Sequence, residues 1–152
     1  MEWMLMPLRR YAEFSGRSRR KEYWMYFLFV AIVSLVLALL DKLLGLGGGS
    51  GSGRGLLSAI FSLGTLVPSL AVGVRRLHDT DRSGWWILLP LATIIPGLAL
   101  MLISLSLGMT LVGLGLFASS VVLLIFMCLD GMRGDNRFGP DPKGPNLTEV
   151  FA

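Results

Sequence analysis

The side chains best suited to chemistry lie together in one polar segment, residues 75–86. His78, Asp79 and Asp81 offer an imidazole and two carboxylates within four positions. These groups could hold a divalent ion, or His78 and Asp79 could form a proton-transferring pair. The ligand set is incomplete because the chain has a single histidine. Neighbouring arginines offer the carboxylates ionic partners: Arg75, Arg76 and Arg82. We therefore expect ion pairs at an interfacial turn, with no metal, no cofactor and no catalytic residue.

Basic residues outnumber acidic ones, with 14 Lys and Arg against 10 Asp and Glu and a formal net charge of +4. Such a balance can indicate nucleic acid binding, but these bases flank apolar stretches instead of covering one surface. We expect no nucleic acid partner. Two interpretations remain open: the bases only orient the chain in the membrane, or they bind anionic lipid headgroups or a protein partner. The candidate residues for such a site are Arg17, Arg20, Arg75, Arg76, His78, Asp79 and Arg82.

The elements that must position these residues are membrane spans. The chain is 53% hydrophobic and 16% charged, and its mean hydropathy is +0.66, whereas a soluble domain carries roughly 25% charged residues. Four apolar stretches approach the roughly 20 residues with which a helix crosses a bilayer. These predicted spans are residues 23–40, 56–74, 85–105 and 110–129. We predict an all-α, polytopic transmembrane helical bundle that forms one integral membrane domain over residues 1–152.

The last two spans come from one uncharged stretch, residues 85–129, which is too long for a single helix to cross the bilayer. Ser, Gly and Thr residues dilute the stretch between Ser104 and Thr110, so we place a turn there. Pro90 and Pro96 are interpreted as kinks within the third span. A re-entrant turn at Pro96 and Gly97 is the alternative.

Lys and Arg counts predict the orientation, because cytoplasmic segments carry the excess of positive charge. Residues 1–22 hold six bases, whereas the glycine-rich loop 41–55 holds two. With the loop 75–84 and the tail 130–152 also inside, twelve bases are cytoplasmic and two are external. A three-span alternative gives nine against five. Both termini are therefore predicted to be cytoplasmic, with residues 2–14 as an interfacial helix.

Three polar segments are predicted to meet on the same membrane face: residues 14–24 (FSGRSRRKEYW), 75–86 (RRLHDTDRSGWW) and 130–142 (DGMRGDNRFGPDP). With these motifs in this order, the chain resembles the YhaH/YhaI-like family of small bacterial inner-membrane proteins, which is defined by a domain of unknown function. The resemblance runs essentially from end to end. It implies a multi-pass protein of the bacterial plasma (inner) membrane, with no established activity, cofactor or catalytic residue.

The leading functional hypothesis is a non-enzymatic module whose charged cytoplasmic face binds anionic lipid headgroups or a protein partner. The alternative is a small oligomeric channel or carrier, and a membrane enzyme acting on lipids is a third. Coupled transporters usually place an ionisable group within the membrane, and the predicted spans contain no charge deep inside them. Small residues four apart, such as Gly115 and Ser119, could serve helix packing within one chain or between copies.

Overall fold

The computed structural model describes residues 2–46 and 55–144. Most of the predicted glycine-rich loop and the end of the tail lie outside these residues. Within them the chain forms α1 (Glu2–Arg9), α2 (Arg20–Leu43), α3 (Leu56–Asp79), η1 (Gly84–Leu88), α4 (Leu89–Met101) and α5 (Leu105–Cys128). In the described part of the chain, four segments are long and apolar enough to cross a membrane: α2, α3, η1 with α4, and α5. The predicted all-α fold with four spans is confirmed.

The chain divides into two compact units. The first comprises Met1–Phe14 and Lys21–Val72, and the second comprises Ser15–Arg20 and Gly73–Ala152. The first unit thus holds α1, nearly all of α2 and most of α3. The second holds the last turns of α3, together with η1, α4 and α5. The three polar segments of the sequence contribute mainly to the second unit.

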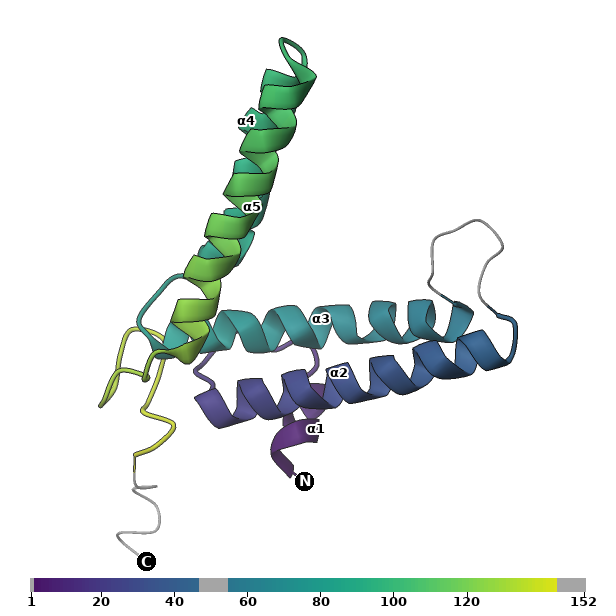
Figure 1. Ribbon diagram of the computed structural model, residues 1–152. Helices are drawn as coiled ribbons and strands as arrows, with labels where there is room; N and C mark the ends of the chain where they lie inside the picture. Colours follow the sequence, from purple (N-terminus) through teal and green to yellow (C-terminus); the bar gives the residue numbers. More distant parts are fainter. Residues whose placement is uncertain (1, 47–54, 145–152) are drawn as a thin grey trace, which may run out of the picture. The chain divides into compact units, whose positions relative to one another are not determined.

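In the first unit, α2 and α3 lie alongside each other (Figure 1). Near one end of the pair, the buried Tyr26 hydroxyl lies 3.3 Å from the Ser69 hydroxyl. At the other end, the Asp41 carboxylate accepts hydrogen bonds from the backbone N–H groups of Leu57 and Ser58 at 3.0 and 2.9 Å. Asp41 was expected in the external loop but belongs to α2. It caps the first turn of α3, whose N–H groups have no partner within their own helix.

The helix at the start of the chain is shorter than predicted, because α1 ends at Arg9 instead of extending to residue 14. Beyond it, Arg10 and Glu13 form an ion pair at 2.6 Å, and the Tyr11 hydroxyl donates to the Gly64 carbonyl at 2.8 Å. The Lys21 ammonium lies 5.7 Å from the centre of the Trp3 ring. The contacts of Tyr11 and Trp3 tie the N-terminal segment to α3 and α2.

In the second unit, α4 and α5 pack against each other as an antiparallel hairpin (Figure 1). The turn between them lies between Met101 and Leu105, earlier than the predicted turn that extended to Thr110. The Thr110 hydroxyl donates to the Ser106 carbonyl at 2.8 Å, so this polar residue is satisfied inside α5. Pro96 lies within α4 without ending it, whereas Pro90 occupies the first turn of the helix and breaks no bond there.

Glycines allow the close contact between α4 and α5. A side-chain carbon on Gly97 would lie 2.3 Å from Val112, and one on Gly115 would lie 2.7 Å from Thr93. At Gly108 the added carbon would lie 2.6 Å from the backbone nitrogen of Met101. Backbone atoms cannot move aside as a side chain can, so this position requires glycine. The small residues therefore serve packing within this hairpin.

Candidate functional site

The first half of the predicted charged loop 75–84 is helical, because α3 continues to Asp79. The helix ends where Asp81 takes a left-handed backbone conformation, at φ 57°, which aspartate tolerates better than most residues. The Arg82 N–H then donates back to the Leu77 carbonyl at 3.0 Å, which satisfies a carbonyl of the last turn. Arg76 and Asp79 consequently lie on the same side of one helical turn.

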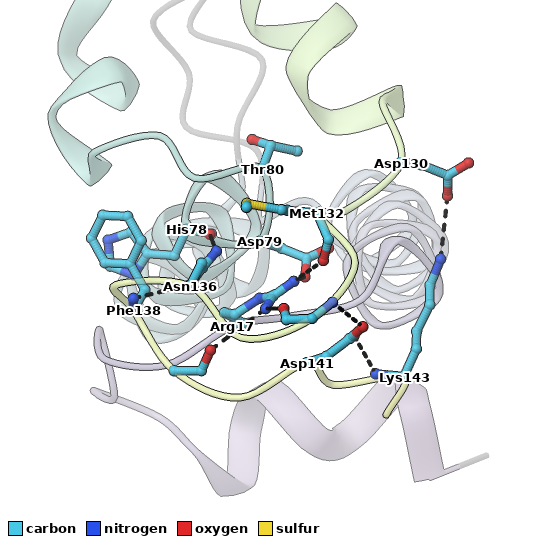
Figure 2. Close-up of polar contacts among 12 residues, drawn as sticks. Arg17, His78, Asp79, Thr80, Asp130, Met132, Asn136, Phe138, Asp141 and Lys143 are labelled. Carbon is cyan, nitrogen blue, oxygen red and sulfur yellow. Dashed lines mark hydrogen bonds and ion pairs between the residues drawn. The ribbon is translucent and has the colours of Figure 1, made fainter. Parts of the chain in front are cut away.

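A buried arginine–aspartate cluster, formed by Arg17, Arg76 and Asp79, lies at this end of α3. Asp79 accepts one hydrogen bond from Arg17 Nε at 3.1 Å and another from Arg76 Nη1 at 2.6 Å, so each carboxylate oxygen has its own guanidinium. The three side chains are at most 2% exposed. Figure 2 shows the Arg17 guanidinium pointing to Asp79, close to the C-terminal segment, residues 130–144. The cluster joins α3 to the segment before α2.

Both arginines of the cluster also donate to backbone carbonyls, at the end of α5 and in the C-terminal segment. Arg17 donates to the carbonyls of Met132 and Gly134, and Arg76 donates to those of Met127 and Leu129. Because a guanidinium carries five N–H donors in a planar fork, it can bind a carboxylate and several carbonyls at once. The cluster therefore fixes the path of residues 127–134 and gives the Asp79 carboxylate two guanidinium partners.

The C-terminus of α5 is capped by arginines that belong to other segments. Besides the two bonds from Arg76, the Arg20 guanidinium donates to the Cys128 carbonyl at 3.0 Å. The last carbonyls of a helix have no partner within it, and positive charge is favourable at this end of the helix dipole. These arginines thus satisfy α5 where it leaves the apolar region.

The C-terminal segment approaches Asp79 closely at Gly131. A side-chain carbon on Gly131 would lie 2.1 Å from an Asp79 carboxylate oxygen. Next to it, the Met132 N–H donates to the Asp79 backbone carbonyl at 2.8 Å. The absence of a side chain at Gly131 therefore lets the chain pass directly over the cluster.

His78 and Asp79 have different partners in the structure. The His78 ring stacks on Phe138 with 3.9 Å between the ring centres and 3° between the planes. Its Nδ1 lies 3.1 Å from the Gly16 carbonyl, and Asn136 Nδ2 donates to the His78 backbone carbonyl at 2.8 Å (Figure 2). His78 therefore anchors the C-terminal segment through its ring and its backbone.

The possible metal ligands are also separated by their partners. Asp81 forms an ion pair with Arg137 at 3.2 Å, while Asp79 belongs to the cluster. Among residues 2–46 and 55–144, no group of three or more His, Cys, Asp or Glu side chains is arranged to hold a metal ion. The described geometry thus offers ion pairs at the positions where the sequence suggested ligands.

The seven candidate residues divide by exposure. Arg17, Arg75 and Arg76 are at most 6% exposed, which removes them from any surface that could meet lipid headgroups. Arg20 is accessible, with 43% of its side chain exposed, and it pairs with Asp130 at 2.5 Å. Arg82 is half-buried and donates to the Thr80 carbonyl at 3.2 Å. Of the predicted basic set, only Arg20 and Arg82 retain access to a membrane surface.

A cavity of about 470 Å³ lies beside the cluster, and its lining includes side chains of both charges. It is lined by Asp79, Asp130, Gly131, Met132, Arg133, Asp141, Lys143 and Gly144. The hydrogen bond from the Lys143 ammonium lowers the pKa of Asp130. Backbone N–H groups of Lys143 and Gly134 lower the pKa of Asp141. Both aspartates thus stay charged and hold the C-terminal segment in a defined turn.

The sequence predictions omitted the partners that residues 130–144 supply. Phe138 and Asn136 hold His78, and the carbonyls of Met132 and Gly134 hold Arg17. The segment was recognised as polar, but a backbone carbonyl leaves no mark in a sequence. The glycine at position 131 was the available signal, since glycine often marks a close approach of the chain.

Comparison with known proteins agrees with this architecture. The chain is 43% identical to the inner membrane protein YhaH of Escherichia coli K12 over 94% of its length and 98% of the relative. It is 41% identical to the inner membrane protein YhaI of the same strain, over 94% of its length and 97% of the relative. No solved structure matches the chain. A multi-pass inner-membrane location follows from these relatives and from the four apolar spans. Because residues 11–140 also match the DUF805 family, described as proteins of unknown function, the chain belongs to that family.

Proposed function

We propose that the protein is a non-enzymatic membrane module whose charged face binds anionic lipid headgroups. The observation that carries the proposal is an excess of positive charge beside the span ends. In residues 15–20 and 73–144, nine Lys and Arg face five Asp, which leaves a net charge of +4 with His78 neutral. The buried cluster accounts for one of these positive charges, since it combines two arginines with one aspartate. The remaining excess lies outside it.

The exposed bases are suited to a lipid surface. Arg133, Arg137 and Lys143 are exposed on the C-terminal segment, and Arg20 lies at the start of α2. The cytoplasmic leaflet carries anionic lipid, and each base near it contributes about 1 kcal/mol. Arg137 pairs with Asp81, and Lys143 pairs with Asp130, so their contributions are smaller than this. The positive-inside rule supports a cytoplasmic position for this face.

The test measures lipid selectivity in reconstituted bilayers. Spin-labelled phosphatidylglycerol and phosphatidylcholine report their relative association with the full-length protein. We expect a preference for phosphatidylglycerol that weakens at high salt, because exposed charges are screened within about 8 Å at physiological ionic strength. The variant Arg133→Gln/Arg137→Gln/Lys143→Gln should reduce the preference roughly two- to fivefold, since its bases are exposed and partly paired.

The control is Lys42→Gln, which removes one base from the opposite end of α2. This variant should keep the preference of the parent protein. All variants retain Arg9, Arg10, Arg17, Arg19, Arg20 and Lys21, so the first helix should insert in the same orientation. If the triple variant selects lipids as the parent does, these bases determine topology only and the proposed function is wrong.

A further inference from the structure

An apolar groove of about 270 Å³ opens at the start of the third span, separate from the charged cavity. It is lined by Ser83, Trp85, Trp86, Leu88, Leu89 and Ala92. Trp85 is 78% exposed and Trp86 is 42% exposed. Tryptophan rings favour the headgroup level of a bilayer, and the groove continues from there along the first turn of α4. The apolar molecule next to the groove is therefore the acyl chain of a lipid.

A cation is fixed at the same end of the groove. The Arg82 guanidinium lies 4.1 Å from the centre of the Phe126 ring, and Trp86 meets the same ring edge to face at 5.4 Å. Phe126 thus contacts both the cation and a wall of the groove. Stacking on Phe126 and the bond to the Thr80 carbonyl hold Arg82 in place while leaving other N–H groups of its fork for an acceptor.

We propose that this groove is a binding site for a single anionic phospholipid, with its phosphate on Arg82 and the upper part of one acyl chain between Trp85 and Ala92. The proposal rests on the proposed function and names one specific site within it. Guanidinium binds phosphate through parallel N–H groups. The groove volume of about 270 Å³ lies just below the roughly 300–1,000 Å³ of pockets that hold a whole small molecule, so it suits one segment of an acyl chain. The charge of Arg82 thus matches the lipid headgroup, and the apolar groove matches the acyl chain.

Fluorescence quenching can report occupancy of the groove. In a Trp3→Phe/Trp24→Phe background, the remaining tryptophans of the chain are Trp85 and Trp86. Phosphatidylglycerol brominated near the top of its acyl chains should quench them more strongly than equally brominated phosphatidylcholine. Both lipids carry a phosphate, but choline balances its charge in phosphatidylcholine. A net attraction of about 1 kcal/mol between Arg82 and the anionic headgroup corresponds to a roughly fivefold higher occupancy by phosphatidylglycerol. Unlabelled phosphatidylglycerol should reverse this difference by competition.

Two variants separate the groove from general charge attraction. Ala92→Phe fills the groove at an exposed position, so it should remove the difference between the two lipids while the protein stays folded. Arg82→Gln should remove it as well. Lys42→Gln, which removes a base from the last turn of α2, should preserve it. Tryptophan emission and elution of each variant in detergent check that it is folded.

The outcomes distinguish this site from the proposed function. Equal quenching by the two brominated lipids, with the bulk preference for phosphatidylglycerol intact, would overturn the groove site and leave the charged face. An unchanged difference in Ala92→Phe would also overturn it. In Arg133→Gln/Arg137→Gln/Lys143→Gln, a retained quenching difference would support the groove site. An unchanged bulk selectivity in the same variant would refute the proposed function of the charged face.

Discussion

Replacing Asp79 with asparagine should free the C-terminal segment from the end of α3. Asparagine keeps the size of the side chain but removes the negative charge that lies between Arg17 and Arg76. The three side chains are at most 2% exposed, so water cannot compensate for the lost charge. The cluster would change from one net positive charge to two. The carbonyls of Met132 and Gly134 would then have to hold Arg17 without its counterion.

The size of the effect follows from burial. Breaking a buried ion pair by removing one partner costs about 3–5 kcal/mol. Asparagine can still accept one hydrogen bond and both arginines keep their carbonyl partners, so we expect about 3 kcal/mol, near the lower end of that range. Since about 1.4 kcal/mol changes an equilibrium constant tenfold, local opening should become roughly a hundredfold more frequent.

Hydrogen exchange followed by mass spectrometry measures this opening segment by segment. Amides in residues 127–141 should exchange roughly a hundredfold faster in Asp79→Asn, while amides in the middle of α2 should keep their protection. Asp130→Asn is the matched control, because it removes the same charge from a carboxylate that is 66% exposed. We expect its exchange to rise far less than in Asp79→Asn, because the ion pairs of Asp130 are exposed to solvent.

A double variant tests the charge argument directly. Adding Arg17→Gln to Asp79→Asn returns the cluster to one net positive charge, so the two changes together should cost less than the sum of their separate costs. Strict additivity would show that Arg17 acts through its carbonyl bonds alone. If Asp79→Asn exchanges no faster than Asp130→Asn, the buried cluster does not hold the C-terminal segment and the reasoning fails.

Further predictions concern packing, capping, pH and topology. Gly108→Ala should lower the melting temperature in detergent, because the added carbon meets the Met101 backbone at 2.6 Å, whereas Gly113→Ala meets no atom within 4 Å and should not lower it. Asp41→Ala should destabilise the start of α3 by removing its cap, and Asp41→Ser should recover part of that stability, measured as exchange at residues 57–60. The pKa of Asp130 is lowered from its ordinary value of 3.8, so the charged carboxylate stabilises the folded C-terminal segment at pH values above 3.8. That contribution is lost as the pH falls through the lower folded value. Protection from exchange, relative to the intrinsic rate at each pH, should therefore fall only in strong acid, and Asp130→Asn should remove this loss of protection. A reporter that is active only in the cytoplasm should be active when it is fused to the C-terminus. Activity of a reporter that works only in the periplasm would contradict the four-span topology.

Much of the candidate site could be located from the sequence, but its geometry could not. The types and order of the polar segments indicated that Arg17, Arg76 and Asp79 belong to one region. The sequence pattern could not show that the cluster is buried. An arginine that orients a helix in the membrane and an arginine that binds a buried carboxylate can occupy the same kind of position beside a span. The residues that decide between these roles are distant in the chain, and two of them, Met132 and Gly134, bind Arg17 through backbone carbonyls.

The sequence by itself determined the four-span helical architecture and the separation of charge from apolar residues. Both are local properties, because the bilayer requires each span to satisfy its own backbone and to bear apolar side chains. Tertiary structure alone decided that Asp41 caps α3, that Arg20 and Arg76 cap α5, and that Arg82 shares Phe126 with an apolar groove. In each case, a polar or charged group contacts a partner that is distant in the sequence, and the periodicity of apolar residues does not predict such a contact. Burial then decides whether an arginine stabilises the fold or remains accessible to a ligand.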